Sequence, residues 1–182
     1  MNAHTYDLIH EREQGGWVNA LAFSPNGIFL ATGGEDEEVV ILNTSNYGEV
    51  QRYKISGLIY TLKYSPDSNY LIIGGYNKKK IILNTTSFQV VRECEREGSI
   101  FSVDFSPDGN FLAVGGEDRR VTILDSSSFN IVQEYERNGS VFIVAYAPNG
   151  RYLASGGDDK EVIVSDMSIL DEVNEHEKDS WI

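Results

Sequence analysis

The sequence has a single cysteine, Cys94, and no long apolar segment. One thiol cannot form an intramolecular disulfide, which excludes the cysteine-rich scaffolds of small secreted domains and favours a reducing compartment. No segment approaches the roughly 20 apolar residues that a membrane-spanning helix needs, and the N-terminus lacks the apolar stretch of a signal peptide. We therefore expect a soluble protein of the cytoplasm or nucleus.

Cationic residues are also scarce. Lys and Arg number 15 against 28 Asp and Glu, which gives a formal net charge of -13 at pH 7. An acidic chain is repelled by phosphate backbones and by anionic membrane surfaces, so we expect neither nucleic acid nor a membrane as a partner. The 182 residues, of which 41% are hydrophobic, suffice for one sizeable core. These quantities predict a single domain over residues 1–182.

The side chains that most often perform catalysis are few. The three histidines, His4, His10 and His176, all lie in the end segments, so a Ser-His-Asp or Cys-His site would have to be built by the termini. The sequence contains no His-Glu-x-x-His, Cys-x-x-Cys, EF-hand or P-loop motif. The sequence therefore predicts no catalytic residue, no metal site and no cofactor.

What the sequence does contain is an internal repeat of 41 residues. The four prolines recur at this spacing, as Pro25, Pro66, Pro107 and Pro148. Glycine pairs recur at the same spacing, as Gly33-Gly34, Gly74-Gly75, Gly115-Gly116 and Gly156-Gly157. The pattern runs without insertion from Tyr6 to Ile182 and predicts units at roughly 6–46, 47–87, 88–128 and 129–169, with a partial unit at 170–182.

Within one unit, short apolar runs bounded by turn residues predict four strands. In the first unit these are Val18–Phe23, 29–32, Glu38–Asn43 and 48–53. The Ser-Pro-Asn-Gly segment makes the first turn, and the glycine pair is expected to supply positive φ angles in the second. A further strand is expected at 6–10, and a new one would begin at Trp181. Four-stranded units bury their faces by stacking on one another.

The period, a V-x-x-L-x-F-S-P start to each unit and third strands such as V-V-I-L-N resemble WD40 repeats over nearly the whole chain. The resemblance implies an all-β propeller of four-stranded blades. The sequence departs from the family where the third-strand tryptophan stands, since Leu42, Leu83, Leu124 and Ser165 replace it. The Gly-His pair that usually precedes the first strand is also absent, with Gln14, Ile55, Arg96 and Arg137 near the histidine position.

These departures remove most of the hydrogen-bond network that the resemblance implies for each blade. Its remaining fragments are Thr32 and Ser155 on second strands and Asp36, Asp118 and Asp159 in the turns that follow. We therefore expect apolar packing to supply more of the stability, through two repeated series: Leu30, Leu71, Leu112 and Leu153, and Ile41, Ile82, Ile123 and Val164.

About four units leave the closure of the propeller open among three arrangements. The chain can be an arc of a larger ring, one half of an approximately eight-bladed ring made by two chains, or a strained four-bladed ring. In the first two arrangements the end blades expose apolar faces to water, which favours self-association of the chain through its terminal blades.

The resemblance implies that loops at one rim of the propeller bind other proteins. Charge at this rim changes from blade to blade, and aromatic residues stand near the first strands, which favours them as contact residues. The candidate rim residues are Trp17, Glu35, Asp36, Tyr60, Lys78, Lys79, Lys80, Phe101, Arg119, Arg120, Phe142 and Asp158. Trp17 breaks the repeat, because its counterparts are Leu58, Ser99 and Ser140. Tyr60, Phe101 and Phe142 share one repeat position and can equally pack between blades.

Two functions are consistent with this pattern. The first is a non-catalytic scaffold or adaptor that presents its rim loops to partner proteins, and the resemblance favours it. The alternative is an enzyme on a propeller framework, in which acidic residues such as Glu35, Glu117 and Asp158 act as acid and base. No motif in the sequence pairs these carboxylates with a nucleophile or a metal.

Overall fold

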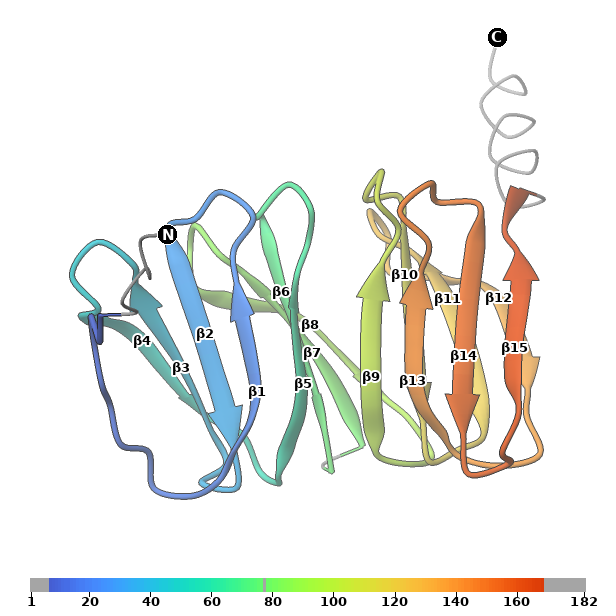
Figure 1. Ribbon diagram of the computed structural model, residues 1–182, viewed down its shortest axis with the longest axis horizontal. Helices are drawn as coiled ribbons and strands as arrows, with labels where there is room; N and C mark the ends of the chain where they lie inside the picture. Colours follow the sequence, from blue (N-terminus) through green and yellow to red (C-terminus); the bar gives the residue numbers. More distant parts are fainter. Residues whose placement is uncertain (1–6, 77, 169–182) are drawn as a thin grey trace, which may run out of the picture.

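The computed structural model describes residues 7–76 and 78–168, and in these ranges the chain forms four antiparallel β-sheets (Figure 1). Each sheet is a meander of consecutive strands, which we call a blade. Blade 1 comprises β1 (Val18–Phe23), β2 (Phe29–Gly34), β3 (Glu38–Asn43) and β4 (Glu49–Lys54). Blade 2 comprises β5 (Ile59–Tyr64), β6 (Tyr70–Gly75), β7 (Lys79–Asn84) and β8 (Gln89–Glu95). Blade 3 comprises β9 (Ile100–Phe105), β10 (Phe111–Gly116), β11 (Arg120–Asp125) and β12 (Ile131–Glu136). Blade 4 comprises β13 (Val141–Tyr146), β14 (Tyr152–Gly157) and β15 (Val162–Asp166).

The expected all-β class and blade architecture are confirmed. In blade 1 the first and third strands have the expected bounds, the second ends two residues later, and the fourth is shifted by one residue. The strand expected at 6–10 is absent from its described part, since residues 7–10 have no strand conformation. Tyr6, the partial unit at 170–182 and the strand expected to begin at Trp181 lie outside the described residues.

In blades 1 to 3, a serine side chain stabilises the turn after the first strand. Ser24 Oγ accepts a hydrogen bond from Phe29 N at 2.9 Å, while Gly27 N donates to the Ser24 carbonyl at 2.8 Å. Gly27 has φ +73°, a conformation that glycine adopts without steric cost. The same arrangement recurs around Ser106, where Gly109 has φ +78°. The Ser-Pro segments therefore form the turns that the sequence predicts.

The glycine pairs have a different role from the one expected. Positive φ angles in the turns between second and third strands belong to Glu37, Lys78, Arg119 and Lys160. The second glycine of each pair instead lies against a carbonyl oxygen at the start of its blade. A Cβ at Gly34 would stand 1.7 Å from Trp17 O, and one at Gly157 would stand 1.8 Å from Ser140 O. Close approach of two backbones, rather than turn conformation, explains these glycines.

Apolar clusters lie between successive blades and hold them together. The first cluster joins Ala31, Val39 and Ile41 of blade 1 to Ile59 and Leu71 of blade 2, all buried. Equivalent clusters lie between blades 2 and 3 and between blades 3 and 4. Each of the two expected apolar series is buried except at one end. Leu30 on blade 1 is partly buried and Val164 on blade 4 is 62% exposed, because each lies on the side of its blade that no described blade covers.

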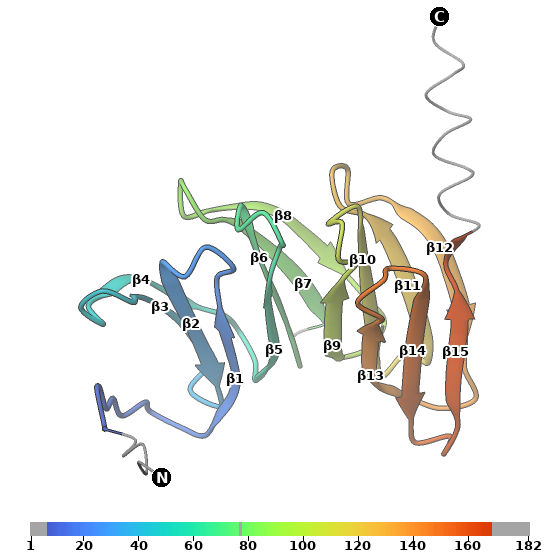
Figure 2. The ribbon, with the colours of Figure 1, turned by 45° about the horizontal axis from the view of Figure 1, so that its top comes forward.

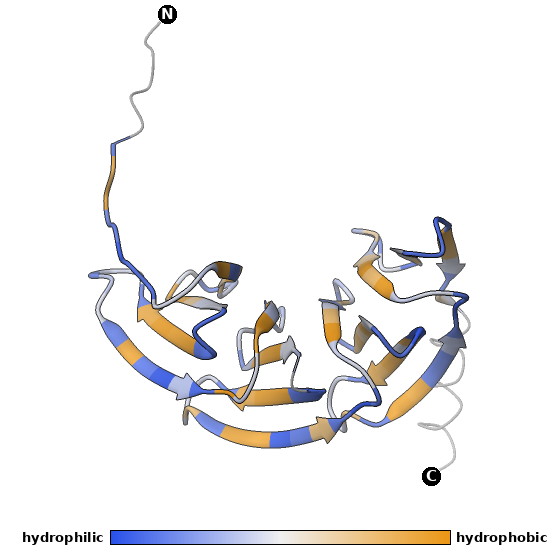
Figure 3. Cartoon of the chain, turned by 90° about the horizontal axis from the view of Figure 1, so that it is seen from below, coloured by the Kyte–Doolittle hydropathy of each residue, from blue (hydrophilic) through white to orange (hydrophobic). Residues whose placement is uncertain are grey.

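The four blades form an open crescent, with β1 and β15 at opposite ends (Figures 2 and 3). The first strands of the blades line its concave side, and the fourth strands of blades 1 to 3 line its convex side (Figures 1 and 3). The described blades thus form an arc and do not close into a four-bladed ring. None of the described residues forms a helix that is long and apolar enough to cross a membrane.

Candidate interaction surface

One rim of the crescent is assembled from two kinds of loop. The turn between the second and third strands of each blade donates a backbone hydrogen bond to the residue or loop before the first strand. Glu35 N donates to Trp17 O, and Glu117 N donates to Ser99 O, both at 2.9 Å. Tyr76 N donates to Leu58 O in blade 2, and Asp158 N donates to Ser140 O in blade 4. These repeated backbone hydrogen bonds hold the two kinds of loop together at one edge of every blade.

Trp17 is 76% exposed and lies at this rim. Its carbonyl is fixed by the Glu35 amide, and Gly34 lies directly against its backbone. The indole is therefore presented to solvent from a rigid backbone position. Large exposed aromatic side chains of this kind dominate the energetics of many protein interfaces.

The charged turn residues lie at the same rim, with one exception. Glu35, Lys78, Arg119 and Asp158 are exposed, while Asp36 and Arg120 are partly buried. Lys79 pairs with Glu93 at 3.1 Å, and Arg120 lies 3.6 Å from Glu134. Lys80 was expected at the rim but is only 5% exposed. Successive residues of a strand point to opposite faces, so Lys80 points between the blades where Lys79 points outward.

Tyr60, Phe101 and Phe142 form a row on the first strands of three blades. The ring centroids of Tyr60 and Phe101 are 5.6 Å apart, and those of Phe101 and Phe142 are 5.5 Å apart. These distances are typical of favourable tilted and edge-to-face aromatic contacts. The rings therefore pack against one another across the blades, and Phe142 remains half exposed at the end of the row. Their contact with a partner stays a prediction.

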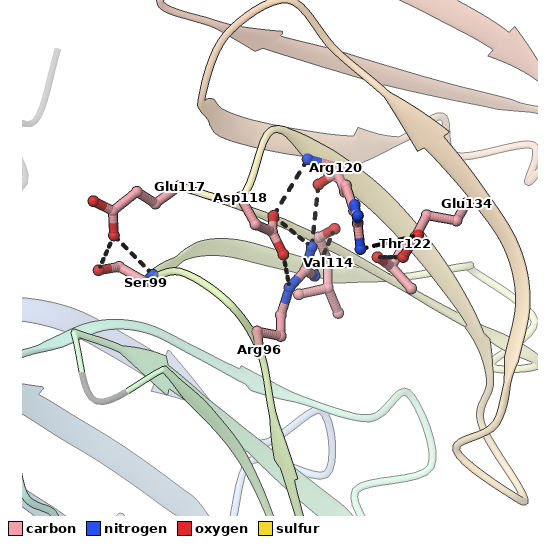
Figure 4. A network of polar contacts seen from close by, with 8 residues as sticks. All are labelled: Arg96, Ser99, Val114, Glu117, Asp118, Arg120, Thr122 and Glu134. Carbon is pink, nitrogen blue, oxygen red and sulfur yellow. Dashed lines mark hydrogen bonds and ion pairs between the residues drawn. The ribbon is translucent and has the colours of Figure 1, made fainter.

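Two arginines form an ion-pair network that sequence reasoning missed. Arg96, just after β8, donates from Nε and Nη2 to the two carboxylate oxygens of Asp118 at 2.7 and 2.8 Å (Figure 4). The same guanidinium donates to the carbonyls of Val114 and Arg120. It thereby joins the end of blade 2 to the turn between β10 and β11 of blade 3.

Arg137 and Asp159 repeat this arrangement one unit later. Arg137 also donates to Ser155 Oγ at 2.5 Å and to the Glu161 carbonyl at 3.0 Å. Arginine therefore occupies the position where the histidine of the family network was expected, and it reaches the Asp and Ser fragments of that network. The signal was present in the sequence, because each arginine precedes its aspartate by 22 residues in two consecutive units.

Blade 1 has the equivalent serine/threonine and aspartate positions, but glutamine replaces the arginine. The equivalents of Arg137, Ser155 and Asp159 are Gln14, Thr32 and Asp36. Gln14 Nε2 and Thr32 Oγ1 are both buried and have no hydrogen-bond partner among the described residues. Buried unpaired polar atoms are costly, so this corner of blade 1 is weaker than its equivalents in blades 3 and 4.

The two end faces of the crescent expose residues whose repeat equivalents are buried. Leu21 on blade 1 is 64% exposed, whereas its equivalents Leu62, Val103 and Val144 are buried. Val164 on blade 4 is 62% exposed, whereas its equivalents Ile41, Ile82 and Ile123 are buried. Each end face thus exposes apolar positions that the other blades bury against a neighbour, and no described blade lies against it.

The carboxylates proposed for an enzymatic alternative lie in turns of three different blades. Glu117 accepts hydrogen bonds from both the N–H and the hydroxyl of Ser99, and these bonds hold the pKa of its carboxyl below the usual range. Such a carboxylate is stabilised as an anion and is poorly suited to act as a general acid. The described residues contain no group of His, Cys, Asp and Glu that could hold a metal ion. His10 stacks on Tyr47, while His4 and His176 lie outside the described residues.

Comparisons with known families agree with the blade geometry. Residues 62–143 match the family described as the WD40 domain of anaphase-promoting complex subunit 4. Residues 6–43 and 129–166 match the WD domain, G-beta repeat. No curated protein matches the chain at a significant level.

Proposed function

Because the chain belongs to the WD40 repeat family, we propose that it is a non-catalytic scaffold that binds other proteins through its rim loops. The observation that carries this proposal is the exposure of Trp17 on a backbone fixed at the rim. WD40 domains commonly serve as protein-interaction scaffolds, and one matching family is named for a subunit of a complex. Activity through Glu35, Glu117 and Asp158 is not proposed, because no observation favours it.

The charged turns beside Trp17 extend the proposed contact surface. Lys78 is exposed in a chain of net charge -13. The equivalent turn of blade 1 is acidic, and that of blade 3 carries the exposed residues Glu117 and Arg119. Exposed ion pairs contribute little to folding, at most about 1 kcal/mol each. Charged rim loops contribute more to partner choice and association rate, which suits a docking surface. A compartment with reduced thiols, the cytoplasm or nucleus, fits the single cysteine of this scaffold.

The experiment compares proteins retained from a lysate by the immobilised chain and by two variants. Trp17→Ala is expected to lower the retention of a specific partner by about tenfold, as for an interface hot spot. Leu8→Ala is the control, because Leu8 is equally exposed and lies outside the rim loops. The melting temperature of both variants should match the wild type. A partner retained equally by all three chains would rule out Trp17 as the contact.

The end faces support a second part of the proposal, in which a second copy of the chain covers them. The free face of blade 4 carries Val162 and Val164, at the positions that Val39 and Ile41 use to contact blade 2. The free face of blade 1 carries Leu21 and Phe23, at the positions that Leu62 and Tyr64 use to contact blade 1. The two faces are therefore complementary by repetition, and two crescents can close end to end.

Light scattering after size exclusion tests this association. We expect a species of about twice the 20.3 kDa chain mass, and we expect Leu21→Asp or Val164→Asp to convert it to the single chain. Val91→Asp on the convex strand β8 is the matched control, since Val91 is half exposed away from both end faces. A wild-type chain that stays at 20.3 kDa at high concentration would contradict the association while leaving the rim proposal intact.

A further inference from the structure

A cavity of about 670 Å³ opens between blades 2 and 3. Blade 2 contributes Lys80 from β7 together with Arg92 and Cys94 from β8. Blade 3 contributes Thr122 and Leu124 from β11, followed by Phe129 before β12. The volume is in the range of small-molecule sites, and its walls combine apolar side chains with a few polar ones.

The 41-residue repeat explains why the cavity is at this junction. Cys94 occupies the position held by Tyr53 in blade 1 and Tyr135 in blade 3. The Tyr53 ring packs against the cluster between blades 1 and 2, and its hydroxyl donates to the Phe88 carbonyl. Cys94 supplies neither ring nor hydroxyl, so the space of a tyrosine side chain is left between blades 2 and 3. The equivalent carbonyl at this junction belongs to Phe129.

The same junction contains a buried cation. Lys80 stands where blades 1 and 3 have Val39 and Val121, it pairs with Cys94 across the strands, and it is 5% exposed. No residue in 7–76 or 78–168 accepts a hydrogen bond or forms an ion pair with its ammonium group. Lys80 Nζ is not among the fully buried atoms that lack a partner, and Lys80 lines the open cavity. A charge with little access to water and no counter-charge is unfavourable, so its presence there points to an external anion.

The other charged groups that line the cavity are engaged or exposed. Asp118 is paired with Arg96, and Glu134 accepts from Thr122 and lies near Arg120 (Figure 4). Glu95 and Glu97 are exposed. Arg92 donates to the Ser128 carbonyl and to Asn130, which leaves its positive charge unneutralised. The cations without a carboxylate partner are therefore Lys80 and Arg92, among the described lining residues.

We propose that this cavity is a binding site for a small aromatic anion, whose ring fills the missing tyrosine and whose carboxylate pairs with Lys80. Leu124 and Phe129, both buried, form the apolar wall for the ring. A hydroxyl on the ring can donate to the Phe129 carbonyl, as Tyr53 does to Phe88. The cavity reaches the rim turn of blade 3, since Asp118 and Arg120 line it. The proposed binding of a small anion does not depend on the scaffold proposal.

Titration calorimetry of the full chain with 4-hydroxybenzoate at pH 7 tests the site. We expect saturable binding of one molecule per chain, and binding of neutral phenol that is weaker by about tenfold or more, as expected for loss of a charged hydrogen bond. Lys80→Met is expected to lower the affinity for 4-hydroxybenzoate by a similar factor. Lys78→Met is the control, because Lys78 is exposed in the preceding turn.

Cys94→Tyr is the sharpest variant, since the repeat already accepts tyrosine at this position in two blades. It is expected to remain folded and to abolish binding, because its ring would occupy the site. Burial lowers the pKa of Lys80 to about 8, so the affinity should also fall as the pH rises from 7 to 9. Absence of saturable binding, or equal binding by wild type and Cys94→Tyr, would overturn the proposal.

Discussion

Arg137 and Asp159 form a bidentate ion pair that joins blade 3 to blade 4. Arg137 Nε lies 2.9 Å from Asp159 Oδ2, and Arg137 Nη2 lies 3.0 Å from Asp159 Oδ1. Both side chains are 3% exposed. Opposite charges in this geometry compensate for their removal from water only while both partners are present. The pair therefore makes the folding of blade 4 dependent on its contact with the loop after blade 3.

Removal of one partner is expected to be severely destabilising. Asp159→Ala leaves the buried Arg137 guanidinium without its counter-charge, which should cost about 3–5 kcal/mol of unfolding free energy. The matched control is Asp36→Ala in blade 1, where the carboxylate accepts only from Glu38 N among the described residues and the loss should be about 1 kcal/mol. Urea denaturation measures both. Similar losses in the two variants would show that the ion pair adds nothing to folding.

The missing cation of blade 1 can be restored. Gln14→Arg places a guanidinium at the repeat position of Arg137, next to Asp36 and the unpartnered Thr32 hydroxyl. The Asp36 carboxylate would gain a counter-charge and the Thr32 hydroxyl a hydrogen-bond partner, and we expect the unfolding free energy to rise by about 1 kcal/mol. Gln14→Met is the control for side-chain packing without charge. A Gln14→Arg variant no more stable than Gln14→Met would mean that the guanidinium does not reach Asp36.

The two glycines of one pair should differ sharply. A Cβ at Gly157 would stand 1.8 Å from Ser140 O, so Gly157→Ala must separate two backbones and should cost about 3 kcal/mol or more. A Cβ at Gly156 would meet its nearest neighbour, Ile143, at 3.6 Å, and Gly156→Ala should be nearly neutral in the single chain. Thermal melts of the two variants compare them directly. Equal melting temperatures would refute the close-approach explanation.

Gly156→Ala also tests the end-face association. Its equivalent Gly115 lies against Val141 of the next blade, where a Cβ would stand 2.6 Å from Val141 Cγ1. A second copy seated on blade 4 would meet the same clash. We therefore expect Gly156→Ala to weaken the dimer while leaving the fold of the single chain intact, and light scattering would detect this. A dimer unaffected by the substitution would place its interface elsewhere.

Lys80 is expected to make stability depend on alkaline pH. Burial and the nearby guanidinium groups lower its pKa from 10.5 to about 8, so the folded chain binds fewer protons than the unfolded chain between these values. Stability should therefore rise with pH through this window, by up to about 3 kcal/mol from this group. Lys80→Met should remove that rise and be more stable than wild type at pH 7. Urea denaturation of wild type, Lys80→Met and the control Lys78→Met at pH 7, 9 and 10 measures the unfolding free energy. The same pH dependence in wild type and Lys80→Met would contradict the prediction.

The strands and turns follow from the sequence because their determinants are local. Alternation of apolar residues and the Ser-Pro turns act within a few residues, and the 41-residue period repeats them. Val18–Phe23 and Glu38–Asn43 accordingly have the predicted bounds. The expected strand is absent over 7–10, because a strand needs a partner strand beside it and repetition alone does not supply one.

Tertiary structure decided which of the repeated side chains carry special chemistry. Lys78, Lys79 and Lys80 are adjacent in sequence, yet only the last is buried, because its face of the strand meets blade 3. The pairing of Arg137 with Asp159 and the cavity beside Cys94 depend on contacts between neighbouring blades. The sequence by itself determined the blades, since short-range patterning specifies strands and turns. Their stacking determined the ion pairs, the cavity and the exposed end faces, since burial depends on what lies across the interface.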